Sequence, residues 1–206
     1  MNLQSESTRR LVVAITGASG ALYGLRLLKA VLEAGYAVDL LVSEYGSRLL
    51  IEECGLNLKT ETVEQWLDRN CGAVERPGNL RQLGVHRMGA DIASGSQRWD
   101  AMIVIPCSMK SLSGIARGAA TNLIERTADV SLKERRPLIL VPRETPLNLI
   151  HLENMTRAAR AGATLVPAMP AFYFGPRTME DLADFIAGRV LNLLGVKHEL
   201  FASWPG

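Results

Sequence analysis

The sequence predicts a single-domain α/β protein built on a doubly wound parallel sheet. The chain has 206 residues, 48% of them hydrophobic, which suffices for one sizeable core. Short apolar runs without polar alternation recur along it, as in strands that are buried on both faces of a parallel sheet. Segments with helical periodicity separate these runs, so strands and helices alternate as in βαβ units.

The first half of the chain begins with two strand and helix pairs. In chain order, we expect a strand at 11–15, a helix at 21–34, a strand at 37–42 and a helix at 44–53. Gly35 closes the first helix, as glycine commonly does. The segment 55–93 is the least periodic part of the chain, and we interpret it as an excursion with one short helix near 62–69.

The second half continues the alternation. We expect a strand at 101–105, a helix at 121–134, a strand at 137–141, a helix at 147–161, a strand at 163–166 and a helix at 178–194. Thr178 should cap the last helix, with Glu180 and Asp181 near the positive end of its dipole. This order is typical of Rossmann-like or flavodoxin-like sheets, with residues 1–9 as a flexible extension of one domain covering 1–206.

Charge and cysteine content exclude several classes of protein. A net charge of +2 is too small to indicate a partner such as nucleic acid or a membrane surface. Cys54, Cys71 and Cys107 lack CxxC spacing, so neither a disulfide framework nor a zinc site is indicated. No apolar stretch reaches the roughly 18 residues that a membrane helix needs. We therefore expect a soluble, cytoplasmic protein.

Polar residues follow the first two strands, where open parallel sheets bind their ligands. Residues 16–20 read Thr-Gly-Ala-Ser-Gly, in which Ser19 can donate to a phosphate and cap the following helix. Without a GxGxxG pattern, this motif alone leaves a simple tight turn equally open. Ser43 stands where a dinucleotide site would place an acidic residue for the ribose, which favours a mononucleotide over NAD.

Two further strand ends carry hydroxyl groups and charges. Residues 106–111 read Pro-Cys-Ser-Met-Lys-Ser, which we interpret as a hydroxyl-rich turn with one cation. Arg143 and Glu144 stand between Pro142 and Pro146, and could recognise a phosphate and carry a proton. The pattern alone favours a surface ion pair, but the position at a strand end reverses that preference.

The motifs TGASGALYG, IPCSMKSLSGIA, NLIERTADVSLKERRPLILVPRETPL, HLENM and PAFY resemble the UbiX-type flavin prenyltransferases in order and spacing. The resemblance covers residues 10–204 and is loosest over 54–91. It implies FMN as cofactor, bound by nine residues: Gly17, Ala18, Ser19, Ser43, Ser108, Met109, Lys110, Ser111 and Arg143.

The resemblance also implies a site for a prenyl phosphate, formed by five residues: Ser94, Lys133, Arg143, Tyr173 and Arg189. Glu144 would protonate the departing phosphate, and Glu53 with Ser19 would handle the proton on the central-ring nitrogen of the flavin. Lys133 would take part in catalysis, and Trp204 would stabilise an allylic cation. By pattern alone, Lys133 would belong to a solvated helix end, Tyr173 to the core, and Cys107 would be a small buried residue.

The implied reaction transfers a dimethylallyl group from dimethylallyl phosphate to reduced FMN, without a metal. Prenylated FMN, the product, would serve as the cofactor of a UbiD-type decarboxylase in ubiquinone synthesis or aromatic acid metabolism. Family resemblance further implies a large homo-oligomer, a dodecamer.

Three alternatives stay open. An FMN-dependent cysteine decarboxylase shares the architecture, but its catalytic His and its Asn-containing motif are missing at the corresponding places. A short-chain dehydrogenase is suggested by TGASG, yet no tyrosine is followed four residues later by Lys. The third alternative is a non-catalytic protein that binds or carries FMN.

We predict tighter binding of FMN than of NAD or FAD, because hydroxyl groups and Arg143 can bind a phosphate while no acidic residue ends the second strand. Calorimetric titration of the purified protein with each nucleotide measures the preference. Tighter binding of NAD would contradict the prediction.

Overall fold

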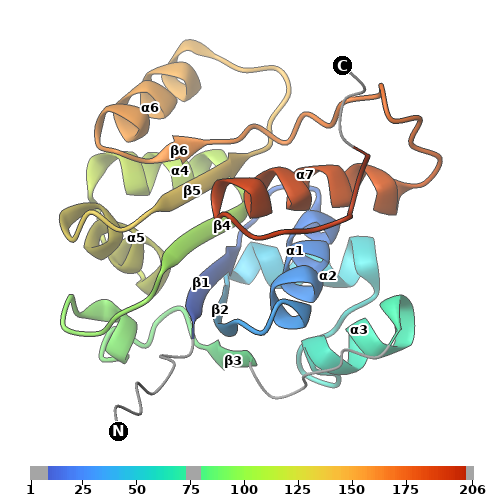
Figure 1. Cartoon of the computed structure of the whole chain (residues 1–206). Helices are drawn as coiled ribbons and strands as arrows, with labels where there is room; N and C mark the ends of the chain where they lie inside the picture. Colours follow the sequence, from blue (N-terminus) through green and yellow to red (C-terminus); the bar gives the residue numbers. More distant parts are fainter. Residues whose placement is uncertain (1–8, 73–79, 203–206) are drawn as a thin grey trace, which may run out of the picture.

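The computed structural model describes residues 9–72 and 80–202, and these form a six-stranded parallel sheet. The strand order is β3-β2-β1-β4-β5-β6 (Figure 1), the order of the Rossmann fold. The strands are β1 (Arg10–Ile15), β2 (Ala37–Val42), β3 (Leu80–Leu83), β4 (Ala101–Cys107), β5 (Leu138–Pro142) and β6 (Thr164–Leu165). The predicted α/β fold class is confirmed.

Helices cover both faces of this sheet. They are α1 (Ala21–Glu33), α2 (Glu44–Cys54), α3 (Val63–Cys71), α4 (Met109–Arg117), α5 (Leu123–Lys133), α6 (Leu149–Arg160) and α7 (Met179–Leu193), with a 3-10 turn η1 (Asp91–Ala93). Figure 1 shows α1 and α7 side by side on one face, where α2 and α3 also pack. The opposite face carries α4, α5 and α6.

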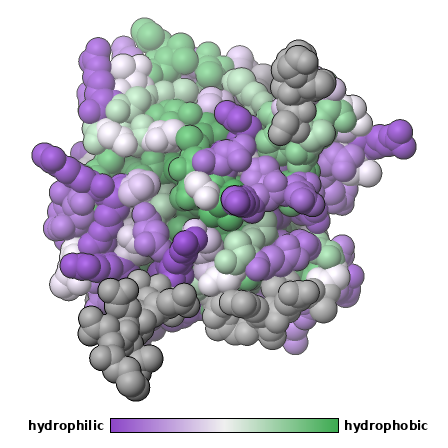
Figure 2. Space-filling view, viewed as in Figure 1, coloured by the Kyte–Doolittle hydropathy of each residue, from purple (hydrophilic) through white to green (hydrophobic). Residues whose placement is uncertain are grey.

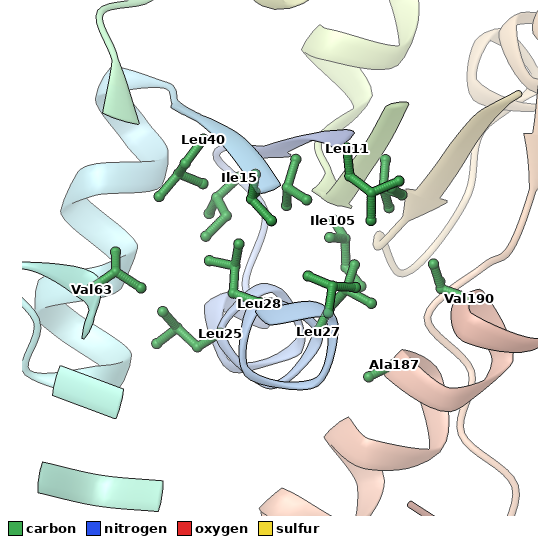
Figure 3. Close-up of a cluster of buried hydrophobic side chains, with 14 of the residues drawn as sticks. Leu11, Ile15, Leu25, Leu27, Leu28, Leu40, Val63, Ile105, Ala187 and Val190 are labelled. Carbon is green, nitrogen blue, oxygen red and sulfur yellow. The ribbon is translucent and has the colours of Figure 1, made fainter. Parts of the chain in front are cut away.

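The alternation of side chains along β1 divides the core into two layers. Leu11, Val13 and Ile15 point to the face of α1 and α7, whereas Val12 and Ala14 point to the other face. All five are fully buried. Figure 3 shows the first layer, in which α1 presents Leu28 on the side of Ile15, Leu25 on the side of Val63 in α3, and Leu27 on the side of α7. A strand buried on both faces explains the continuous apolar run in the sequence.

The predicted elements are confirmed to within two residues, and three further elements, β3, η1 and α4, were not predicted. Thr178 caps α7 through the amide of Asp181, as predicted. The residues 106–111 are not a turn, because β4 continues to Cys107 and Ser108 caps a new helix, α4. Strand β3 was missed because it lies at an edge and carries two exposed polar residues instead of an apolar run.

A buried carboxylate ties β3 to the sheet. Asp39 on β2 is 2% exposed, and Arg81 on β3 donates to its Oδ1 at 2.7 Å. Arg10 Nη2 lies 2.6 Å from Oδ2, which is an ion-pair contact and not an aligned hydrogen bond. Both arginines also contact Asp91.

Burial acts to raise the pKa of Asp91, but these arginines outweigh it and lower that pKa. The contribution of Asp91 to stability is therefore lost as pH falls through this lowered value.

In the part of the chain that the structure describes, no helix is both long and apolar enough to cross a membrane.

Asp39→Asn should destabilise the fold by about 1–3 kcal/mol, because it removes a charged acceptor from two arginines at a buried position. The free energy of unfolding in denaturant, compared at equal protein concentration, measures the change.

Glu52→Gln is the matched control. Glu52 pairs with Arg48 on the exposed surface of α2, where such a pair contributes about 0.5 kcal/mol or less. Equal effects of the two substitutions would contradict a special role for Asp39.

Candidate functional site

The strand order reverses between β1 and β4, and one side chain joins the ends of these strands. Thr16, which is fully buried, donates its hydroxyl to the carbonyl oxygen of Pro106 at 2.8 Å. The amide of Ser108 donates in turn to the hydroxyl oxygen of Thr16, also at 2.8 Å. The amide of Ser43 reaches the carbonyl of Ile15, and that of Arg143 the carbonyl of Cys107. Four strand ends are thus held together at the carboxyl edge of the sheet.

A first cavity, here called the serine cavity, opens at this edge with a volume of about 420 Å³. Its lining includes seven residues predicted for the site: Gly17, Ser43, Ser108, Met109, Lys110, Ser111 and Glu144. Ser43 and Ser108 are the N-caps of α2 and α4, so the positive ends of two helix dipoles face the same space. Hydroxyl groups, backbone amides and Lys110 make this cavity suited to a phosphate-bearing ligand.

A second cavity, here called the Glu53 cavity, has a volume of about 750 Å³ and lies between α1, the ends of α2 and α3, and the start of α7. Three predicted site residues line it: Ser19, Glu53 and Arg143. The loop after β1 therefore contributes Gly17 to one cavity and Ser19 to the other. Arg143 and Glu144 are divided in the same way, so both loops lie on the boundary of the two cavities.

Glu53 caps helix α1 from a neighbouring helix. Its Oε2 accepts hydrogen bonds from the amides of Gly20 and Ala21 at 2.8 and 2.9 Å. The prediction that Ser19 caps this helix is wrong: the N-cap is Gly20, whose φ of 106° suits glycine, and it makes no side-chain cap. Ser19 therefore does not cap α1, and it lines the Glu53 cavity instead.

Arg143 and Glu144 do not pair with each other. Arg143 is exposed, and no hydrogen bond or ion pair engages its guanidinium within the described residues. The carboxylate of Glu144 accepts a hydrogen bond from the amide of Thr145 at 3.0 Å. The surface ion pair that the pattern alone suggested is absent between these two described residues, which leaves the guanidinium available to an anion.

Five of the predicted residues that the structure describes line neither cavity. Lys133 ends α5 at the amino edge of the sheet and pairs with Glu134 at 2.6 Å, which agrees with the solvated helix end that its pattern suggested. A Cβ on Gly95 would lie 2.9 Å from its Nζ, so Ser94 lies in the loop next to Lys133. Across β5, this edge is on the order of 15 Å from Arg143. Lys133 and Arg143 of one chain therefore do not share a site.

Tyr173 and Arg189 lie on the outer surface of the fold. Tyr173 is 42% exposed and makes edge contacts with Phe174 and Phe185, so the alternative of a core residue is wrong. Arg189 is exposed on α7. Ala18 is buried and lines neither cavity. Trp204 lies outside the described residues.

Burial makes the thiols of Cys107 and Cys54 poor nucleophiles. Burial raises the pKa of Cys107 to about 12, which confirms its interpretation as a small buried residue. Burial and the charge of Glu53 raise the pKa of Cys54 to about 11. Within the described residues, no group of three or more His, Cys, Asp and Glu side chains could hold a metal ion.

Comparison with known proteins decides the family. The flavoprotein family model matches residues 1–191. The flavin prenyltransferase UbiX of Halalkalibacterium halodurans is 50% identical over 192 residues, covering 93% of this chain and 91% of the relative. UbiX of Pseudomonas aeruginosa is 45% identical over 95% of this chain and 93% of its own length. The chain belongs to the UbiX flavin prenyltransferase family.

Solved structures of UbiX proteins have the same fold. A structure of AnUbiX (PadA1) in complex with FMN and dimethylallyl pyrophosphate superimposes with a TM-score of 0.85, at 40% identity over 97% of this chain and 98% of that one. A dodecameric FMN-dependent UbiX-like decarboxylase from Escherichia coli O157:H7 gives 0.83 at 40% identity, over 96% and 100% of the chains. A mutant PPC decarboxylase, with 16% identity and a TM-score of 0.58 over 91% of this chain and 99% of that one, shares the fold alone.

Sequence reasoning missed several residues that line the two cavities. Tyr23 and Arg26 lie on α1 just beyond the TGASG loop, where their distance from a strand end hid them. Tyr45, His86 and Glu125 line the serine cavity. His86 follows β3, which the sequence did not reveal as a strand. Tyr45 lies two residues after Ser43 and is exposed, and an aromatic residue so close to a predicted ligand contact is a pattern that could have been noticed.

Gly17→Ala should weaken FMN binding in this UbiX protein by about 10-fold, equivalent to about 1.4 kcal/mol. A Cβ at Gly17 would lie 2.5 Å from the Cβ of Tyr45, so the loop and α2 would have to separate. Titration monitored by flavin fluorescence gives the dissociation constant.

Gly89→Ala is the matched control, since a Cβ there would meet no atom within 4 Å. An unchanged FMN dissociation constant in Gly17→Ala would show that the close approach of the loop to α2 does not shape the binding site.

Proposed function

We propose that this protein is a flavin prenyltransferase that transfers a dimethylallyl group from dimethylallyl phosphate to reduced FMN. The observation that carries the proposal is the pair of adjacent cavities bounded by the same two loops. One is surrounded by phosphate-binding groups, and the other contains an uncompensated guanidinium beside two candidate proton carriers. A relative of the same fold has been crystallised with FMN and dimethylallyl pyrophosphate, which supports two ligands side by side.

FMN fits the serine cavity by the chemistry of its lining. Its phosphate would be held by Ser43, by the amides and hydroxyls at the start of α4, and by Lys110. The flavin ring would extend past Gly17 toward Ser19 and the Glu53 cavity. Reduced FMN supplies the nucleophile, and the protein must orient it and accept the proton that it releases.

Ser19 and Glu53 are placed for that proton transfer. Oε2 of Glu53 is held by two backbone amides, which fixes the carboxylate and leaves Oε1 without a hydrogen-bond partner among the described residues. Ser19 has an uncommitted hydroxyl in the same cavity. A fixed acceptor beside the flavin is what general base catalysis needs.

Arg143 and Glu144 would act on the prenyl phosphate. When the bond between the allylic carbon and oxygen breaks, the electron pair leaves with the phosphate. Arg143 would stabilise the growing negative charge, and Glu144 would supply a proton to the departing oxygen. The two residues line different cavities, which supports a departing phosphate at the boundary where the new bond to the flavin would form.

Lys133, Tyr173 and Arg189 can serve this site only if other copies of the chain supply them. A related UbiX-like protein is dodecameric, which supports a large homo-oligomer here as well. Leu149, Ile150 and Leu152 of α6 are 69%, 59% and 46% exposed, and Figure 2 shows hydrophobic surface over α6 at the top of the view. Such surface is suited to contacts between subunits.

The product would pass to a UbiD-type decarboxylase in ubiquinone synthesis or aromatic acid metabolism. Three free cysteines suit a reducing compartment, so we place the reaction in the cytoplasm.

The direct test is incubation of the purified protein with reduced FMN and dimethylallyl phosphate, followed by mass spectrometry of the flavin. We expect the mass to rise by one five-carbon prenyl group while inorganic phosphate is released. Binding of FMN without any change in its mass would favour a flavin carrier instead.

Glu144→Gln should slow the chemical step by about 100-fold or more, the usual scale for a general acid, while leaving FMN affinity nearly unchanged. Glutamine keeps the shape of the side chain but cannot give a proton. Single-turnover measurements with saturating prenyl phosphate isolate this step.

Lys133→Ala should have a different effect from Glu144→Gln. Loss of the cation should weaken binding of prenyl phosphate and raise its KM, whereas Glu144→Gln should slow the chemical step. An unchanged chemical step in Glu144→Gln would eliminate Glu144 as the acid.

A further inference from the structure

Tyr23 lines the Glu53 cavity from the first turn of α1. Its ring packs against the α-carbon of Gly20: a Cβ at Gly20 would lie 2.5 and 2.6 Å from two ring carbons. The amide of that same glycine donates to Glu53. The phenol ring and the carboxylate are therefore anchored on one residue of the loop after β1, next to Ser19.

Most polar groups of this cavity are already engaged. Arg26 binds both carboxylate oxygens of Asp184, at 2.6 and 2.5 Å, so its charge is compensated. The indole of Trp66 donates to the carbonyl of Cys54, and the amide of Asn70 donates to the carbonyl of Trp66. None of these three side chains is free to bind an anion without giving up a contact.

Three donors remain uncommitted among the described residues that line the cavity: Ser19, Tyr23 and Arg143. Glu180 lines the same cavity from α7, and its negative charge disfavours an anion on that side. A phosphate should therefore bind at the side of Arg143, and the hydroxyl groups of Tyr23 and Ser19 are the neutral donors that line the same cavity.

We infer that Tyr23 positions the prenyl phosphate, its hydroxyl donating to the phosphate beside Arg143 while its ring packs against the five-carbon chain. This role rests on the proposed function. An amphipathic side chain suits a ligand that is apolar at one end and anionic at the other. Trp66, which is 5% exposed, lines the same cavity and adds apolar surface for the chain.

The charges around the phenol agree with this role. Burial raises the pKa of Tyr23, Arg143 acts to lower it and Glu53 acts to raise it. The net result is a raised pKa, so the hydroxyl stays protonated and remains a donor at neutral pH. Arg143 and Glu53 line the same cavity as the phenol, and their opposite effects on its pKa partly cancel.

Tyr23→Phe tests the inference, because it removes the hydroxyl and keeps the ring. We expect the KM for dimethylallyl phosphate to rise about 10-fold or more, the scale of one hydrogen bond to a charged group, with kcat nearly unchanged. Inorganic phosphate, used as a competitive inhibitor, should lose affinity by a similar factor. The FMN dissociation constant and the melting temperature of Tyr23→Phe should equal those of the unaltered protein.

Tyr36→Phe is the matched control. Tyr36 is 5% exposed, lies outside both cavities, and its hydroxyl is 3.5 Å from Arg9. Its removal should leave the KM, kcat and phosphate inhibition at their original values.

Two results would overturn the inference: an unchanged KM in Tyr23→Phe, or a raised KM with unchanged inhibition by inorganic phosphate. The second result would mean that the hydroxyl does not contact the phosphate. Failure of the proposed function is distinguishable, since the unaltered protein would then release no phosphate from dimethylallyl phosphate at all.

Discussion

The hydroxyl of Thr16 joins the ends of β1 and β4 at the point where the sheet reverses its strand order. It donates to one backbone group and accepts from another, so both strand ends are fixed by a single buried side chain. The loop after β1 lines both cavities, and the residues after β4 line the serine cavity. Since a site for two ligands needs its walls fixed relative to each other, the geometry of both cavities depends on this bridge.

The carboxylate of Glu53 both stabilises helix α1 and is the proposed proton acceptor. A carboxylate at the N-terminus of α1 satisfies two amides that would otherwise lack partners and complements the dipole of the helix. Because a glutamate of α2 performs this task, the loop after β1 needs no capping side chain of its own. Ser19 can therefore contact a ligand in the Glu53 cavity. The carboxylate of Glu53, which caps the helix in its place, would lie beside the proposed flavin ring.

The two cavities differ in their positive groups, and each arrangement suits a different substrate. The N-cap residues of α2, α4 and α5 line the serine cavity, so three helix N-termini can attract a phosphate without a buried cation. The Glu53 cavity contains two arginines, of which Arg26 is neutralised by Asp184 and only Arg143 is uncompensated. An anion therefore has one favourable position there, close to the boundary where the flavin would lie.

The sequence by itself determined the alternation of strands and helices, the loops at the strand ends and the family, because these depend on local patterns of hydrophobicity and on short motifs. It placed Ser19, Ser43 and Ser108 at the carboxyl edge correctly, since parallel strands all end there. Only the tertiary structure decided which residues share a cavity. Glu53 reaches α1 across 33 residues, Tyr23 turns toward it from a helix, and Lys133 lies at the opposite edge. These placements follow from packing between elements distant in sequence, which local patterns do not encode.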